Sequence, residues 1–247
     1  MTRPMFAAVA AAVIVAPAMA PATAVAALPA PIAAAAANPA RADDAKLDAR
    51  RKGPELLAFA GVKPGQRVYD LIPGGGYFTR LFSLAVGPSG KVYSVWPEEY
   101  DKVSHPDSDV LRKMAAAAPF TNVKVMVQPG KAFSAPEPLD LVFTSQNYHD
   151  YPDKFMGHID PAVLDAAVYK ALKPGGLFVI VDHRAKPGAG LAATDTLHRI
   201  DIATVKAQVT AAGFRFDGES PLLANPKDPL TLAVFDPTIR GHTDSSC

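Results

Sequence analysis

Two short polar segments, each directly after an apolar one, carry side chains that can move protons. Residues 147–150 follow the apolar stretch 139–144, and residues 182–184 follow the stretch 177–181. A histidine near its ordinary pKa can take a proton from a hydroxyl group, and a neighbouring carboxylate can fix its tautomer. The sequence therefore predicts these catalytic residues: His149, Asp150, Asp182 and His183.

The same segments also offer nitrogen and oxygen ligands for a metal ion. The candidate ligands are His149, Asp150, Asp182, His183 and His198, which are residue types that divalent transition ions bind. No short His-x-x-x-His spacing supports a metal centre, so a metal-dependent hydrolase is kept only as an alternative. Serine hydrolysis is disfavoured, because Ser94 and Ser145 lack the Gly-x-Ser-x-Gly elbow.

A third segment, Val68–Thr79, has the pattern of a buried strand, a glycine turn and the start of a helix. Its three consecutive glycines, Gly74, Gly75 and Gly76, let the backbone turn tightly and approach a ligand. The helix start offers unpaired N–H groups to an anionic or polar ligand. No Gly-Lys-Ser/Thr follows, so a P-loop is excluded.

Apolar strands alternate with helical segments over most of the chain. The pattern predicts helices over 43–60, 77–86, 107–118, 160–172 and 201–213. Strands are predicted at 67–71, 91–95, 123–127, 139–144, 177–181 and 214–222. This order is typical of an α/β fold with a doubly wound, mostly parallel sheet. The polar ending of the chain predicts that a final antiparallel strand is truncated, or represented only by a piece around 230–235.

These signals together resemble the class I S-adenosylmethionine-dependent methyltransferase family. The resemblance rests on four segments spread over roughly 54–222: Val68-Tyr69-Asp70 with Gly74 and Gly76, Gly90-Lys91-Val92, Leu139-Asp140-Leu141-Val142, and Ala171-Leu172-Lys173-Pro174-Gly175-Gly176. It implies a Rossmann-like sheet, S-adenosylmethionine as cofactor and methyl transfer to a small molecule. The cofactor residues that it implies are Asp70, Gly74, Gly75, Gly76, Tyr77, Thr79, Trp96, Glu98 and Asn147.

The chain departs from the family pattern at three positions. Ile72 stands where the family loop has glycine, and Trp96 where the family has a ribose-binding carboxylate, with Glu98 and Glu99 just beyond. Lys131 replaces an acid in the segment after the third strand. These departures keep open a second interpretation, a non-catalytic or re-purposed relative that binds another small ligand in the same cleft.

The N-terminus has the pattern of a cleavable signal peptide. Arg3 precedes the apolar run Met5–Val15, and Ala24-Val25-Ala26 suits cleavage before Ala27. We expect a signal peptide at 1–26, a flexible Ala/Pro-rich linker at 27–42 and the methyltransferase-like domain at 43–247. A narrower resemblance, carried by Val181-Asp182-His183-Arg184, Gly188-Ala189-Gly190 and Thr196–Asp201, is to predicted exported bacterial methyltransferases. The expected location is therefore the periplasm or the exterior.

Composition limits the possible partners. The formal net charge of +1 in 247 residues disfavours binding to nucleic acid through phosphate contacts. The single cysteine, Cys247, allows no internal disulfide and no cysteine-based site. No segment after the signal is apolar and long enough to predict a membrane span. The sequence predicts a small-molecule substrate and leaves the oligomeric state open.

Overall fold

The computed structural model describes residues 27–104, 107–239 and 245–246. A twisted sheet with strand order β3-β2-β1-β4-β5-β6 forms its centre. The strands are β1 (Arg67–Leu71), β2 (Lys91–Pro97), β3 (Val123–Gln128), β4 (Leu139–Ser145), β5 (Leu172–His183) and β6 (Ser245–Ser246). The first five pair in parallel, and only β6 is antiparallel. The predicted α/β fold with a doubly wound, mostly parallel sheet is confirmed.

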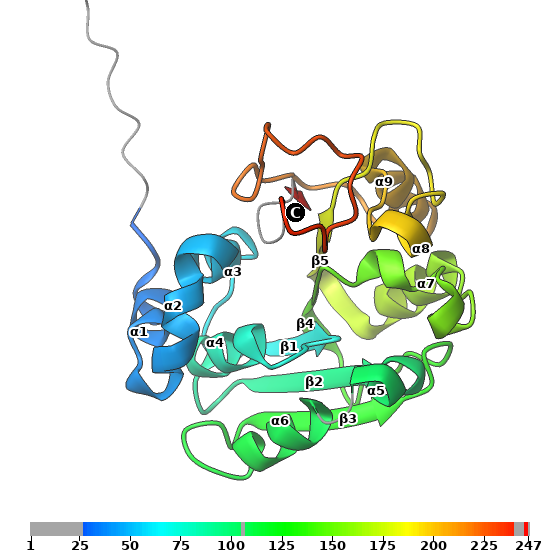
Figure 1. The fold of residues 1–247 in the computed structure, drawn as a ribbon. Helices are drawn as coiled ribbons and strands as arrows, with labels where there is room; N and C mark the ends of the chain where they lie inside the picture. Colours follow the sequence, from blue (N-terminus) through cyan, green and yellow to red (C-terminus); the bar gives the residue numbers. More distant parts are fainter. Residues whose placement is uncertain (1–26, 105–106, 240–244, 247) are drawn as a thin grey trace, which may run out of the picture.

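Helices cover both faces of this sheet and create two apolar cores (Figure 1). The helices are α1 (Ala30–Ala36), α2 (Ala42–Arg51), α3 (Gly53–Phe59), α4 (Tyr77–Val86), α5 (Glu98–Ser104), α6 (Asp107–Ala115), α7 (Pro161–Ala171), α8 (Thr194–Leu197) and α9 (Ile202–Ala211). Short 3-10 helices η1 (Pro39–Arg41), η2 (Tyr148–Asp150) and η3 (Lys154–Met156) complete them.

Side-chain alternation along the strands divides the two cores. In β1, Val68 packs with α1, α3 and α4, whereas its neighbour Tyr69 faces the core of α7. Because successive strand residues point to opposite faces, one strand serves both cores. The carboxyl ends of all five parallel strands then lie at one edge, where β1 separates the β2–β3 half from the β4–β5 half.

The N-terminal segment is better ordered than its composition predicts. The flexible linker expected up to residue 42 is wrong for residues 30–41, which form α1 and η1. Ile32 and Ala35 are buried against the core of α4. Pro31 and Pro39 suit the helix starts, because the N–H that proline lacks has no helical partner in the first turn. The predicted signal peptide lies outside the described residues.

The C-terminal strand predicted at 214–222 is also wrong, since these residues form an irregular coil, as does the piece around 230–235. Phe214 packs its ring against Tyr169 of α7 and Phe178 of β5, at centroid distances of 5.1 and 5.8 Å. Gly218 and Pro221 interrupt the segment and suit a strand poorly. The two-residue β6 takes the place beside β5, pairing with Asp182 and His183.

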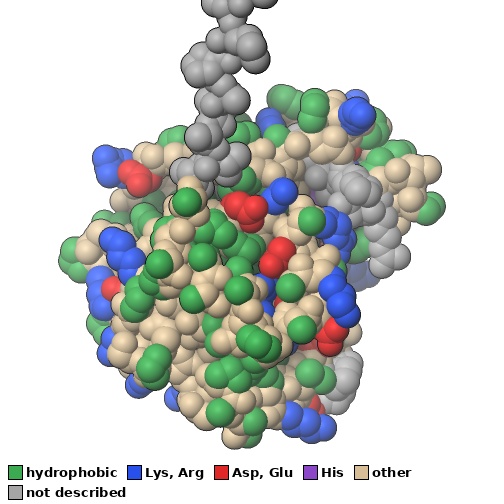
Figure 2. Space-filling view, turned by 90° about the vertical axis from the view of Figure 1, so that its left-hand side faces the viewer, with side chains coloured by type: hydrophobic (Ala, Val, Ile, Leu, Met, Phe, Trp, Pro, Cys, Tyr) green, Lys and Arg blue, Asp and Glu red, His purple; other side chains and the backbone are tan. Residues whose placement is uncertain are grey.

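The face of the molecule that carries the N-terminal helices shows acidic and basic side chains scattered among apolar ones (Figure 2). This mixture on the drawn face agrees with the nearly balanced charge of the sequence. Within the described ranges, none of the helices combines the length and apolar character needed to cross a bilayer.

Candidate functional site

A cavity of about 620 Å³ opens at the carboxyl edge of the sheet, beside the switch point between β1 and β4. Two walls enclose it. The glycine wall consists of α2, the loop after β1 and the start of α4, and the histidine wall consists of η2, the end of β5 and His198. Tyr100 and Val103 of α5 and Phe235 border the cavity between the walls. This position is where open α/β sheets bind their ligands.

The loop after β1 brings its backbone to the cavity surface. Gly74 has φ +52°, and a Cβ built on Gly74 or Gly75 meets no atom within 4 Å, so both glycines face open space. Gly76 differs, because a Cβ there would collide with Leu111 of α6. Gly74 and Gly75 therefore leave room for a ligand, while Gly76 lets α4 and α6 pack closely.

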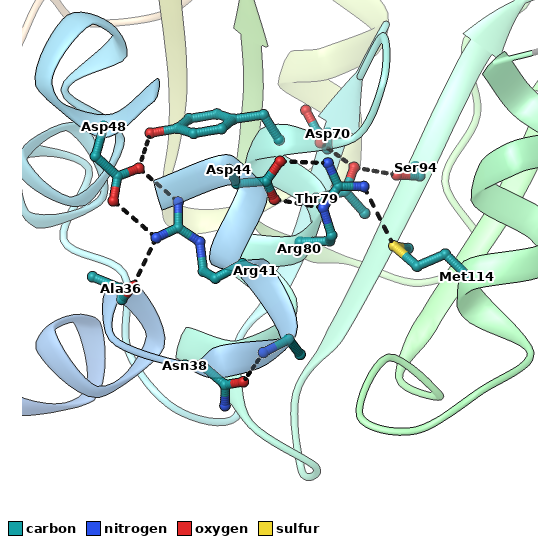
Figure 3. A network of polar contacts seen from close by, with 12 residues as sticks. Ala36, Asn38, Arg41, Asp44, Asp48, Asp70, Thr79, Arg80, Ser94 and Met114 are labelled. Carbon is teal, nitrogen blue, oxygen red and sulfur yellow. Dashed lines mark hydrogen bonds and ion pairs between the residues drawn. The ribbon is translucent and has the colours of Figure 1, made fainter. Parts of the chain in front are cut away.

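The N-terminal helices are fixed to α4 by partly buried ion pairs and hydrogen bonds (Figure 3). The fully buried Arg41 donates to Asp48, at 2.7 Å from Nη2 to Oδ1, and Asp48 also accepts from the Tyr77 hydroxyl at 2.6 Å. Arg80 of α4 donates to both oxygens of Asp44, at 2.5 and 2.7 Å. These contacts hold α2 against the first turn of α4 and complete the glycine wall.

Asp70 is the second-last residue of β1, just before the glycine loop, and is 2% exposed. The Thr79 hydroxyl donates to it at 2.6 Å and lies 2.7 Å from the Ser94 hydroxyl (Figure 3). Burial raises the pKa of Asp70 to about 7, and the Thr79 hydrogen bond opposes this shift. Asp70 lines the cavity, so a cationic ligand group beside it would favour its ionised form.

Arg51 is a cavity residue that the sequence reasoning missed. It comes from α2, and its guanidinium lies 4.7 Å from the ring centre of Tyr77 and 5.1 Å from that of Phe78. Cation–π contacts of this kind hold the group in place without using its hydrogen-bond donors. The basic run Arg50-Arg51-Lys52 was a signal for it, but nothing in the run shows which member faces the sheet.

On the histidine wall, His149 is held between two buried carboxylates. Its Nδ1 lies 2.7 Å from Asp182 Oδ1, and its backbone N–H donates to Asp182 Oδ2 at 2.8 Å. Its Nε2 lies 3.2 Å from Asp150 Oδ1 and 3.4 Å from His198 Nδ1. Burial alone disfavours a charged ring, but Asp182 and Asp150 together raise the pKa of His149 to about 10.

His183 lies next to this group and behaves in the opposite way. Its ring centre is 6.1 Å from that of His149, and its Nδ1 is 3.1 Å from the Ser245 hydroxyl. Burial lowers the pKa of His183 to about 4. The predicted catalytic residues His149, Asp150, Asp182 and His183 are thus brought together, and all but Asp182 line the cavity.

Several predicted cofactor residues lie away from the cavity. Asp70, Gly74, Gly75, Tyr77 and Asn147 line it, whereas these do not: Gly76, Thr79, Trp96 and Glu98. Trp96 is fully buried in β2 and does not line the cavity. Glu98 points to solvent at the start of α5, and the next residue, Glu99, accepts from the Gly130 backbone at 2.9 Å.

Three residues other than glycine adopt positive φ angles on the cavity surface. They are Ile72 (+55°), Gln146 (+67°) and His198 (+52°). This conformation is strained for side chains with a Cβ, and most of all for a β-branched one. Asn147 donates to the Ile72 carbonyl at 3.0 Å and helps to hold the strained turn. Strain that gathers at a cavity indicates a functional site.

The comparisons with known proteins agree with this architecture. No protein-family model matches the chain. The ubiquinone/menaquinone biosynthesis C-methyltransferase UbiE of Pasteurella multocida is 30% identical over 124 residues, which are 50% of this chain and 42% of that protein. The chain therefore spans less than half the length of this curated relative.

Solved structures give a longer match. A SAM-dependent methyltransferase from Aquifex aeolicus has a TM-score of 0.55 and 19% identity, covering 74% of this chain and 86% of that one. The glycopeptide N-methyltransferase MtfA in complex with S-adenosylmethionine has a TM-score of 0.51 and 17% identity, covering 68% and 79%. The chain described here has the fold of the class I S-adenosylmethionine-dependent methyltransferases.

Proposed function

We propose that this protein is an S-adenosylmethionine-dependent methyltransferase that acts on a small molecule. The observation that carries the proposal is the side-chain-free surface of Gly74 and Gly75, which opens into the cavity at the switch point of a methyltransferase-type sheet. The likeness to UbiE, a protein named as a C-methyltransferase, supports methyl transfer as the reaction class.

The residues of the glycine wall suit this cofactor. S-adenosylmethionine bound there would supply an electrophilic methyl group. Arg51 would pair with the carboxylate of its amino-acid part, and Asp70 would accept from its ammonium group, since both side chains line the cavity. Asn147 lines the cavity and keeps the loop after β1 in place, so it would help to bind the amino-acid part of the cofactor.

The rim of the cavity favours an acceptor with an apolar part. Val103, Phe155 and Phe235 border the cavity and are 63%, 37% and 60% exposed. Large apolar side chains that remain exposed around a polar cavity are typical of ligand contacts. The reacting group of the acceptor would be a hydroxyl, amine or thiol that faces the histidine wall.

His183 is the better candidate for a general base, because its lowered pKa keeps the ring neutral near pH 7, whereas the raised pKa of His149 keeps that ring protonated. Both ring nitrogens of His149 already face other side chains of the histidine wall, namely Asp182 on one side and Asp150 with His198 on the other. His183 lines the cavity at the end of β5, adjacent to that wall. It would accept the acceptor's proton as the methyl group is transferred.

Calorimetric titration of the purified protein with S-adenosylmethionine and S-adenosylhomocysteine tests the cofactor. We expect one site per chain for each ligand. Absence of binding up to millimolar ligand would overturn the proposal. Where binding is seen, methyl-labelled S-adenosylmethionine and a fractionated small-molecule extract identify the acceptor, and His183→Gln is expected to slow labelling while cofactor binding is retained.

One observation favours a second candidate, a re-purposed relative that binds a different small ligand. The strand-two position that carries a ribose-binding carboxylate in the family holds the buried Trp96, and Glu99 is bonded to the Gly130 backbone. This candidate predicts that the titrations above are silent, while a thermal-shift screen of small anions and amines finds a stabilising ligand.

We further propose that the protein is exported. The support is the N-terminal pattern of Arg3, the apolar run Met5–Val15 and the small residues before Ala27. Expression in a bacterial host followed by fractionation and mass spectrometry of the mature N-terminus tests this. A chain that starts at Ala27 in the periplasmic fraction is expected, and a full-length chain in the cytosolic fraction would contradict the proposal.

A further inference from the structure

Three side chains of the histidine wall bring possible metal-ligand atoms close together. His149 Nε2, Asp150 Oδ1 and His198 Nδ1 are separated by 3.2, 3.4 and 3.7 Å. Ligands bound about 2.1 Å from one tetrahedral ion lie about 3.4 Å apart, so the triangle has the size of a first coordination shell. We propose that these three residues bind a divalent transition-metal ion of the Zn²⁺ type.

The surroundings of His149 prepare it to be a ligand. The Asp182 carboxylate contacts His149 twice, at 2.7 Å from the ring Nδ1 and at 2.8 Å from the His149 backbone N–H. Asp182 Oδ1 also accepts from the His183 backbone N–H at 2.7 Å. A histidine that donates from Nδ1 to a carboxylate offers the lone pair of Nε2 to the metal. The carboxylate–histidine–metal arrangement is therefore already built on the β5 side.

His198 comes from a different segment, and contacts of its ring and of the following residue fix its position. It ends α8 with φ +52°, and its ring packs edge-on against Phe235 at 4.8 Å between centroids. The next residue, Arg199, is fully buried and donates to Asp228 and to the Leu232 carbonyl. These contacts of Arg199 fix the backbone next to His198 and so maintain the strained φ angle of His198.

The charges of the described residues also favour a cation. Asp150 and Asp182 are 4% and 5% exposed, and the groups that face Asp150 in this cluster are the two imidazoles. Buried carboxylates require a counter-charge, and a divalent ion between His149, Asp150 and His198 would supply it in place of the proton that the His149 ring holds without a metal. Two imidazole nitrogens and one carboxylate oxygen suit Zn²⁺, Co²⁺ or Fe²⁺ better than Mg²⁺ or Ca²⁺.

Three protein ligands leave coordination positions for a further ligand. His149, Asp150 and His198 all line the cavity that contains the glycine loop, so the open positions face a small molecule bound there. The ligand class is an anionic or polarisable oxygen, such as a carboxylate or a phenolic hydroxyl. If the proposed function holds, that oxygen belongs to the methyl acceptor; the metal site itself does not depend on this.

The test is calorimetric titration of chelator-treated, full-chain protein with ZnCl₂, together with visible absorption of the Co²⁺-loaded protein, both without S-adenosylmethionine. One ion per chain and intense Co²⁺ bands of a distorted tetrahedral site are expected. His198→Asn, which tolerates a positive φ, and Asp150→Asn are expected to weaken Zn²⁺ binding about 100-fold, and Asp182→Asn about 10-fold.

His158→Asn is the matched control, because His158 is exposed, also has a positive φ of +52° and does not line the cavity. It should bind Zn²⁺ as the unmodified protein does. Circular dichroism verifies that each variant is folded. Equal Zn²⁺ affinity in His198→Asn, Asp150→Asn and the control would overturn the metal site, and so would absence of binding in the folded unmodified protein. Binding of S-adenosylhomocysteine, measured separately, decides the methyltransferase proposal independently.

Discussion

The two walls of the cavity are built on different physical principles. In the glycine wall, the ion pair Arg41–Asp48 lies behind the surface and the pair Arg80–Asp44 lies at the cavity lining; both hold the helices of the wall, while Gly74 and Gly75 leave the loop surface free of side chains. In the histidine wall, titratable groups face one another across 3.2 to 3.7 Å on the surface itself. The first arrangement suits binding by shape, and the second suits the control of protons or of a metal ion.

The largest expected effect tests the binding role of the glycine wall. Gly74→Val should weaken S-adenosylhomocysteine binding by at least about 100-fold, since the new side chain enters the cavity at φ +52°. Gly175→Val is the control, because Gly175 has φ +79° and equally open space but is remote from the cavity. Calorimetric titration of both variants with S-adenosylhomocysteine measures the two affinities. Equal losses would show that backbone strain, and not the cavity, explains the effect.

The second prediction concerns the ion pairs behind the glycine wall. Asp48→Ala leaves the Arg41 guanidinium buried without its carboxylate, so we expect a loss of about 3 kcal/mol in the free energy of unfolding. Asp43→Ala, which removes an exposed pair with Lys46 on the same helix, should cost much less. Urea unfolding measures both, and similar values would refute the structural role of Asp48.

The third prediction concerns a carboxyl group behind the histidine wall. Asp165 is fully buried, and burial raises its pKa to about 7, although the Tyr148 hydroxyl donates to it at 3.0 Å. Because the folded protein retains this proton above the ordinary pKa of 3.8, its contribution to stability decreases as pH rises from about 4 to about 7.

Asp165→Asn removes that ionisation with little change in shape. We expect the variant to be more stable than the unmodified protein by about 2 kcal/mol at pH 8, and the difference to shrink toward pH 4. Thermal unfolding at several pH values measures it. A difference that does not change with pH would mean that Asp165 titrates normally in the folded protein.

The smallest expected effect tests whether a charged side chain of the glycine wall also contributes to ligand binding. Arg51→Met keeps the aliphatic contact with Tyr77 and Phe78 but removes the charge that faces the cavity. Binding of S-adenosylhomocysteine should weaken about 10-fold, the loss of one charge-assisted hydrogen bond. Arg50→Met, at the exposed neighbouring position, should leave binding unchanged. No loss in Arg51→Met would place the ligand's carboxylate elsewhere.

The sequence was sufficient for the five parallel strands but not for the strand after them, because apolar runs and glycine turns are local signals. The strand before Gly74 and the helix from Tyr77 to Val86 are where the pattern predicted them. The convergence of His149 and His183 also followed from the rule that parallel strands end at one edge.

The remaining features depended on contacts between distant segments. Ala-rich residues 30–36 form a helix because Ile32 and Ala35 pack against α4, which composition alone does not show. Trp96 is a core residue because the end of β2 is covered, so its aromatic ring gave a misleading signal. His198 meets His149 across 49 positions of sequence through a strained turn, and no motif spacing encodes that meeting.

The strained turn at Ile72 has a consequence for how the chain tolerates mutation. Its positive φ is held in part by the hydrogen bond from Asn147 to the Ile72 carbonyl, and both residues border the same cavity. The effect of replacing one should then depend on the identity of the other. A glycine at position 72 would relieve the strain and make loss of the Asn147 amide less harmful, so a substitution of Asn147 is expected to be tolerated better when Ile72 is replaced by glycine than when Ile72 is present.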